Sequence, residues 1–103
     1  MSQILSRIKQ AVREGRFDFS AKARLEMQVD DLEEIDVIES IANASVVYKS
    51  LRSTSGWRVA KREYLHVIIS PNSSGLMIYT KGKLASYAGI ETYYFFVSSK
   101  RSD

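Results

Sequence analysis

The residues of this chain that could do chemistry are cations and tyrosines in its second half, where carboxylates are scarce. Residues 45–103 hold nine Lys and Arg against three Asp and Glu, whereas residues 1–44 hold six against nine. A surface that carries Lys, Arg and Tyr with few carboxylates favours a polyanion as its ligand. RNA is therefore the natural candidate for what this half of the chain binds.

Such a surface could also cleave RNA, because the 2′-hydroxyl of RNA is a nucleophile for the adjacent phosphorus. An enzyme must remove the hydroxyl proton, stabilise the negative charge on the phosphorane and protonate the departing 5′-oxygen. Lys and Arg suit the second task as preorganised cations. A lysine packed against other cations and partly desolvated has a lowered pKa, and like a tyrosine it could then transfer protons.

Other kinds of site find little support in the sequence. There is no cysteine, which excludes disulfides and thiolate zinc sites, and the single histidine, His66, cannot form a pair or a cluster. We expect His66 to be a hydrogen-bonded residue of an otherwise apolar strand. No glycine-rich phosphate loop and no G-x-S-x-G elbow is present. The six acidic residues between positions 30 and 39 fit a capped helix with a solvated outer face better than a metal site, so neither metal nor cofactor is predicted.

Three helices are predicted in the first half of the chain, from apolar residues at helical spacing. The first should end near Gly15, the second should follow Ser20 over residues 21–28, and the third should be capped at residues 30–31 and stop at Asn43. Their buried faces are predicted to be Ile4, Leu5, Ile8, Ala11 and Val12; Ala21, Leu25 and Met27; and Ile35, Ile38, Ile41 and Ala42.

Four strands are predicted to follow, over residues 45–51, 57–69, 76–84 and 92–100. Helices followed by sequential strands predict an α+β fold, with two or three N-terminal helices packed on a four-stranded, largely antiparallel sheet. Residues 1–103 are expected to form one domain, since no linker or internal repeat is visible. No secretory signal and no bilayer-length apolar run is found, so a cytoplasmic protein without a membrane partner is expected.

Alternation along the strands sorts the cations onto faces. In the strand predicted over residues 57–69, one face carries Arg58, Arg62, Tyr64 and His66. In the strand over residues 76–84, one face carries Met77, Tyr79, Lys81 and Lys83. In the strand over residues 92–100, one face carries Tyr94, Phe96, Ser98 and Lys100. A concave face that gathers Lys49, Arg58, Tyr79 and Lys100 is compatible with these groups, although alternation alone does not show that the faces coincide. Tyr79 fits packing and base stacking about equally well.

Several of these residues also have an ordinary structural explanation. Lys81 and Lys83 lie near a predicted turn, where a lysine usually protects the edge of a sheet. Lys49 lies in mid-strand among apolar residues, and a functional role is favoured there because an unpaired lysine is costly to bury. Trp57 and Tyr94 are expected to pack in the core rather than to stack on bases.

Five short segments occur in an order and spacing similar to those of a known family. They are Leu5-Ser6-Arg7-Ile8-Lys9, Val47-Tyr48-Lys49-Ser50, Ser55-Gly56-Trp57-Arg58, Met77-Ile78-Tyr79-Thr80-Lys81 and Val97-Ser98-Ser99-Lys100. On these segments the chain resembles the MqsR family of toxins from bacterial type II toxin–antitoxin systems, within the RelE-like group of small ribonucleases.

The resemblance implies a metal-independent endoribonuclease that cleaves mRNA and leaves a 2′,3′-cyclic phosphate. It implies catalytic roles for Lys49, Tyr79 and Lys100, and it adds Arg58, which stands where the family has a glutamine, to the catalytic set as a phosphate clamp. It also implies a separately encoded antitoxin protein as partner. The further RNA-binding residues that we predict around this set are Arg52, Trp57, Arg62, Lys81, Lys83 and Arg101.

Two other functions stay open on the residues alone. One is a non-catalytic RNA-binding module of the same fold, which predicts binding that weakens steeply with salt and no strand scission. The other is an interaction domain whose basic face meets an acidic protein, which predicts no RNA affinity at low salt.

Overall fold

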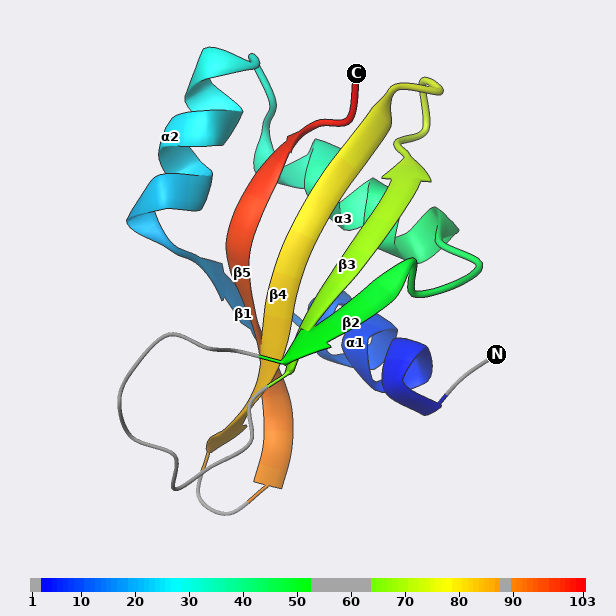
Figure 1. The fold of residues 1–103 in the computed structure, drawn as a ribbon, viewed down its shortest axis with the longest axis vertical. Helices are drawn as coiled ribbons and strands as arrows, with labels where there is room; N and C mark the ends of the chain where they lie inside the picture. Colours follow the sequence, from blue (N-terminus) through cyan, green and yellow to red (C-terminus); the bar gives the residue numbers. More distant parts are fainter. Residues whose placement is uncertain (1–2, 53–63, 88–89) are drawn as a thin grey trace.

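The computed structural model of the chain describes residues 3–52, 64–87 and 90–103, which form an α+β fold (Figure 1). The general class predicted from the sequence is therefore confirmed. Three helices come first in the chain, with one short strand among them, and four strands follow. The elements are α1 (Gln3–Arg13), β1 (Phe17–Phe19), α2 (Ala21–Val29), α3 (Glu34–Asn43), β2 (Lys49–Arg52), β3 (Tyr64–Pro71), β4 (Met77–Tyr87) and β5 (Ile90–Arg101).

The sheet has five strands in the order β1-β5-β4-β3-β2. β1 is parallel to β5, and the other neighbours are antiparallel. The predicted four-stranded sheet was wrong because β1 was missed. β1 has only three residues, too few to show an alternating pattern. It is held by pairing with β5 and by the stacking of Phe19 on Phe96, whose ring centroids are 4.7 Å apart.

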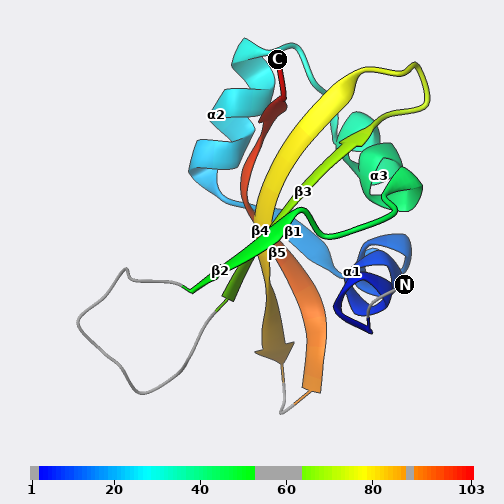
Figure 2. The same ribbon diagram turned by 45° about the vertical axis from the view of Figure 1, so that its right-hand side comes forward.

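The helices cover one face and one edge of the sheet. α1 and α3 lie together on the same face, and α2 runs beside the end of β5 beyond β1 (Figures 1 and 2). The hydrophobic core lies between α1, α3 and the sheet. Its fully buried members include Leu5, Ile8, Val37, Ile41, Ile68, Ile78, Tyr94 and Phe96.

α1 agrees with the sequence, and α2 and α3 agree only in part. Leu5, Ile8, Ala11 and Val12 are buried as predicted, and Gly15 ends the helical segment with a φ of +78°. α2 buries Ala23 and Met27, while the predicted Ala21 and Leu25 are exposed. α3 buries Val37, Ser40 and Ile41, while the predicted Ile35 and Ala42 are exposed and Ile38 is half-buried.

The start of α3 also differs from the prediction. Glu33, rather than Asp30 or Asp31, is its N-cap and forms a reciprocal capping box with Asp36. Asp31 has a φ of 57°, in the left-handed region, so it belongs to the turn that ends α2. None of the helices in the described segments is long and apolar enough to cross a membrane.

The strand boundaries shift by a few residues. β2 begins at Lys49 instead of residue 45, and β4 continues to Tyr87. β3 is described from Tyr64 onward, so the predicted strand residues 57–63 lie outside the described residues.

Candidate nucleic-acid interface

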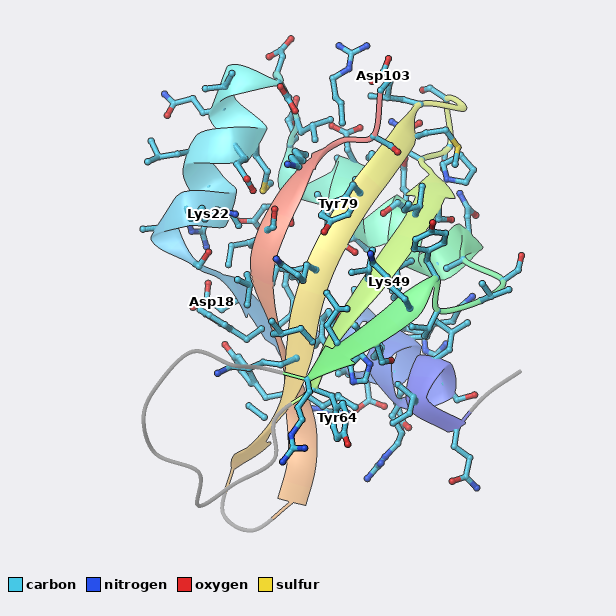
Figure 3. All side chains as sticks on the ribbon, viewed as in Figure 1. Asp18, Lys22, Lys49, Tyr64, Tyr79 and Asp103 are labelled. Atoms are coloured by element: carbon cyan, nitrogen blue, oxygen red, sulfur yellow. The ribbon has the colours of Figure 1, made fainter. Side chains whose placement is uncertain are left out.

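The face of the sheet opposite α1 and α3, here called the open face, gathers lysines from three strands. In the pairing of β4 with β5, Tyr79 is opposite Lys100, and Lys81 is opposite Ser98. Across β3, both Lys81 and Lys49 pair with Val67. Directly paired residues present their side chains to the same face. Figure 3 shows Lys49 and Tyr79 on the side of the sheet away from α1 and α3.

An irregularity in β5 decides where Lys100 lies. Lys81 pairs with Ser98 but the next residue, Gly82, pairs with Phe96, so Val97 is an extra residue in β5. Such a bulge reverses the facing of the residues on either side of it. Tyr94 and Phe96 therefore lie in the core, whereas Ser98 and Lys100 lie on the open face. The predicted grouping of these four residues on one face was wrong for this reason.

Gly82 makes room for this arrangement on the core side. A Cβ atom at this position would lie 2.6 Å from the ring of Tyr94 and 2.7 Å from the backbone oxygen of Phe95. Any side chain at position 82 would thus collide with the strand that carries the bulge. Tyr94 itself is fully buried, as predicted, and burial raises the pKa of its hydroxyl group.

Three cations, Lys49, Lys81 and Lys100, form what we call the lysine row. Neighbouring strands are about 4.8 Å apart, so the backbones of Lys81 and Lys49 are separated by about 10 Å across Val67. None of the three forms an ion pair with a described residue. None of the described side chains of β2, β3, β4 and β5 is a carboxylate. Among the described side chains, the open face therefore carries positive charge that no carboxylate of these strands offsets.

Aromatic rings form cation–π contacts with the lysines at the two ends of the lysine row. The ammonium of Lys100 lies 5.4 Å from the centre of the Tyr79 ring, and that of Lys49 lies 5.8 Å from the centre of the Tyr48 ring. Cation–π contacts of this length are weakly attractive at exposed sites. They hold the lysines near the sheet and leave their hydrogen-bond donors available. Lys49 and Lys100 also line two separate grooves, of about 440 and 420 Å³.

The other predicted contact residues divide between the two faces. Lys83 lies on the open face opposite Phe95. Arg52 pairs with Tyr64 and alternates with Lys49, and Arg101 pairs with the buried Ile78, so both lie on the other face of the sheet. Trp57, Arg58 and Arg62 lie outside the described residues.

One carboxylate of α2 and the carboxylate of its C-cap, Asp30, hold β5, a role that was not predicted for either residue. Glu26 Oε1 accepts hydrogen bonds from Ser98 Oγ at 2.7 Å and from the Ser99 N–H at 3.1 Å. Asp30 Oδ2 accepts the N–H of Arg101 at 2.8 Å. Four residues of helix and two residues of strand each rise by about 6 Å, so the two acceptors match alternate donors of the strand edge. The four-residue spacing of the two carboxylates was the available signal.

The charge on Glu26 is stabilised where it lies. Burial by itself would raise the pKa of this carboxyl group. The hydrogen bonds from Ser98 and Ser99, together with the ammonium of Lys22 at 3.2 Å, outweigh that effect and leave the pKa below its ordinary value. Glu26 is thus an ionised acceptor that fixes the segment of β5 on which Lys100 stands.

His66 lies away from the lysine row. It pairs with Gly82 on the core side of the sheet, is buried, and its Nδ1 lies 2.8 Å from Ser50 Oγ. Burial lowers the pKa of its imidazole. The structure therefore shows the hydrogen-bonded strand histidine that we expected. Among the described residues, no group of three or more His, Cys, Asp or Glu is placed to hold a metal ion.

Comparison with known proteins found no matching family model, no matching curated protein and no matching solved structure. The function of the chain is therefore inferred from the geometry of the open face.

Proposed function

We propose that the open face binds the phosphate backbone of RNA and cleaves it beside Tyr79. The observation that carries this proposal is the placement of Tyr79, Lys81 and Lys100 together on two paired strands, with Lys49 farther along the same face. Cations without acidic partners favour an anionic ligand, and a chain of phosphates matches a row of them. A tyrosine beside Lys100 at one end of this row supplies a hydroxyl group that can move a proton.

The reaction needs only groups that stand on this face. The 2′-oxygen attacks the neighbouring phosphorus, and its proton passes to a base of the site. The bond from phosphorus to the 5′-oxygen breaks, and that oxygen takes up a proton, which leaves a 2′,3′-cyclic phosphate and a 5′-hydroxyl. We assign acceptance of the 2′-proton to the amine of Lys81, donation of a proton to the 5′-oxygen to the hydroxyl group of Tyr79, and stabilisation of the phosphorane charge to Lys100.

Lys49 receives a different role in this proposal from the one that the family resemblance implies. It stands two strands, about 10 Å, from the strand of Tyr79 and Lys81. We therefore propose that Lys49 binds a neighbouring phosphate and sets the direction of the RNA chain. Single-stranded RNA is the better substrate, because an extended strand can follow the lysine row and turn its bases away from it.

The proposal is tested by incubating the purified chain with labelled single-stranded RNA in EDTA. Lys100→Ala should lower the cleavage rate by about 10²-fold or more, as expected for a group that acts on the reacting phosphate. Arg101→Ala is a matched control, because it removes the neighbouring cation from the opposite face and should leave the rate close to that of the unchanged chain.

The outcomes distinguish the three functions. Equal loss of cleavage in both variants would contradict the assignment of the open face. Binding of RNA that weakens with salt, without scission, would show a binding module, and no binding at low salt would favour an acidic protein ligand. The toxin role and the antitoxin partner implied by the family resemblance are tested separately. Expression in a bacterium should arrest growth, Lys100→Ala should relieve the arrest, and a neighbouring gene should rescue the unchanged chain.

A further inference from the structure

The outer edge of β2 is the end of the sheet, and no strand among the described residues pairs with it. β2 has four residues, and all four are exposed. Along an antiparallel edge strand, alternate backbone N–H and C=O groups point away from the neighbouring strand. These groups form a template to which an extended segment can add as a further strand.

Apolar side chains are exposed around this edge. Val46 is 61% exposed, Tyr48 62% and Leu51 38%. A groove of about 440 Å³ lies beside them, lined by Ile4 of α1 and by residues 45–47, 49 and 50. An added strand could place an apolar side chain in this groove, because side chains on neighbouring strands pack against one another. The edge thus offers both backbone groups and an apolar anchor point.

The charges of β2 argue against a second copy of this chain as the added strand. Lys49 and Arg52, at its two ends, are its only charged residues. Antiparallel pairing of two β2 strands about their centre would place Lys49 opposite Arg52, and parallel pairing in register would place identical cations side by side. Like charges that face each other destabilise a pair of strands, whereas opposite charges stabilise it. The edge therefore fits an acidic strand of a different protein.

We propose that the outer edge of β2 binds an extended, acidic segment of a partner protein by strand addition. Asp or Glu residues of this segment lie opposite Lys49 and Arg52, and an apolar residue enters the groove beside Val46. The proposal shares Lys49 with the lysine row but does not depend on RNA cleavage, because the backbone groups and the groove that it uses belong to the sheet edge.

A displayed library of random decapeptides, selected on the full chain, tests this proposal. The selected peptides should be rich in Asp and Glu alternating with Val, Ile or Thr. A selected peptide, made synthetically and bound to the full chain, should protect backbone amides of β2 from hydrogen exchange. Reversing both charges, Lys49→Glu with Arg52→Glu, should weaken the binding of that peptide to the chain by about tenfold or more. The same charge change elsewhere, Arg13→Glu with Arg101→Glu, should leave its binding nearly unchanged.

Several results would overturn the proposal. They are a failure to select any peptide, selected peptides without acidic bias, and protection confined to other strands. A peptide-free dimer that protects β2 would also overturn it, because the occupant would then be a second copy of the chain. The peptide composition and the exchange pattern are measured on the unchanged chain, so they test strand addition at β2 even if a β2 variant fails to fold.

Discussion

The two faces of β4 and β5 use neighbouring residues in opposite ways. On the face toward α1 and α3, Ile78, Tyr94 and Phe96 are fully buried in the core. On the open face, Lys81 and Lys100 stand one residue away from buried positions and have no acidic partner among the described residues. The same pair of strands thus stabilises the fold on one side and presents charge on the other.

This difference indicates which residues are available for a ligand. Like charges on neighbouring strands destabilise a sheet, whereas apolar residues packed under helices stabilise it. The lysine row is therefore explained better by an anion that offsets the repulsion than by a role in folding. Substitutions on the two faces should accordingly change different measured quantities.

The largest expected effect on folding comes from the core side of β5. Phe96→Ala removes a fully buried ring that stacks on Phe19, and it should lower the free energy of unfolding by about 3–5 kcal/mol. Phe95→Ala is its matched control, since Phe95 is the same residue type on the open face and is only half-buried. Its loss should be about 1 kcal/mol. Urea unfolding followed by circular dichroism measures both values.

Equal losses for the two phenylalanines would contradict the assignment of faces in β5. A larger loss of unfolding free energy for Phe95→Ala would mean that residues 90–96 of β5 are shifted by one position relative to β4. Such a shift exchanges the two faces of the strand.

The second effect concerns the bulge that turns Lys100 to the open face. Gly82→Ala places a methyl group 2.6 Å from the Tyr94 ring and 2.7 Å from the Phe95 oxygen, so ring and backbone must move. We expect unfolding free energy to fall by about 1–3 kcal/mol, as in other overpacked sites. An exposed glycine in the same conformation would instead gain about 0.4–1 kcal/mol when replaced by alanine. A measured gain in urea unfolding would therefore contradict the close contact at position 82.

The buried face of a helix was predictable where its sequence has one apolar stripe. It was not predictable where the sequence has two such stripes and another element of the fold buries one of them. α1 has one apolar stripe, and it is buried as expected. α2 has two, one through Ala23 and Met27 and one through Ala21 and Leu25, and spacing alone cannot decide between them. The choice is made by the edge of β5, which is distant in sequence. β1 was missed because its stability comes from its partner strand.

The candidate site was predictable within single strands and not between them. Alternation correctly places Tyr79 with Lys81 on β4. It fails in β5, because one extra residue at Val97 reverses the faces and leaves no local mark in the sequence of that strand. The separation of Arg52 and Arg101 from the lysine row likewise depends on strand pairing. The role of Glu26 required knowing that α2 lies along the edge of β5.

The smallest of these effects on folding concerns the contact that fixes the segment carrying Lys100. Glu26→Gln keeps the shape of the side chain but replaces the charged carboxylate, which accepts hydrogen bonds from Ser98 and Ser99, with a neutral amide. We expect the free energy of unfolding at neutral pH to fall by about 1 kcal/mol, since hydrogen bonds to charged groups are stronger than neutral ones. Urea unfolding of the two proteins across a range of pH measures this difference.

The pH dependence of that difference identifies its source. The pKa of Glu26 is lowered in the folded chain, so its contribution is complete above the ordinary value of 4.5 and is lost as the pH falls through the folded pKa. Unchanged and variant proteins should therefore converge in acid. Glu14→Gln provides the comparison, because Glu14 has a lowered pKa but is exposed, and its side-chain bonds to described residues are those to Gln10 and Arg16, nearby in sequence. A difference for Glu26→Gln that persists unchanged in acid would show that packing, and not the charge, holds α2 against β5.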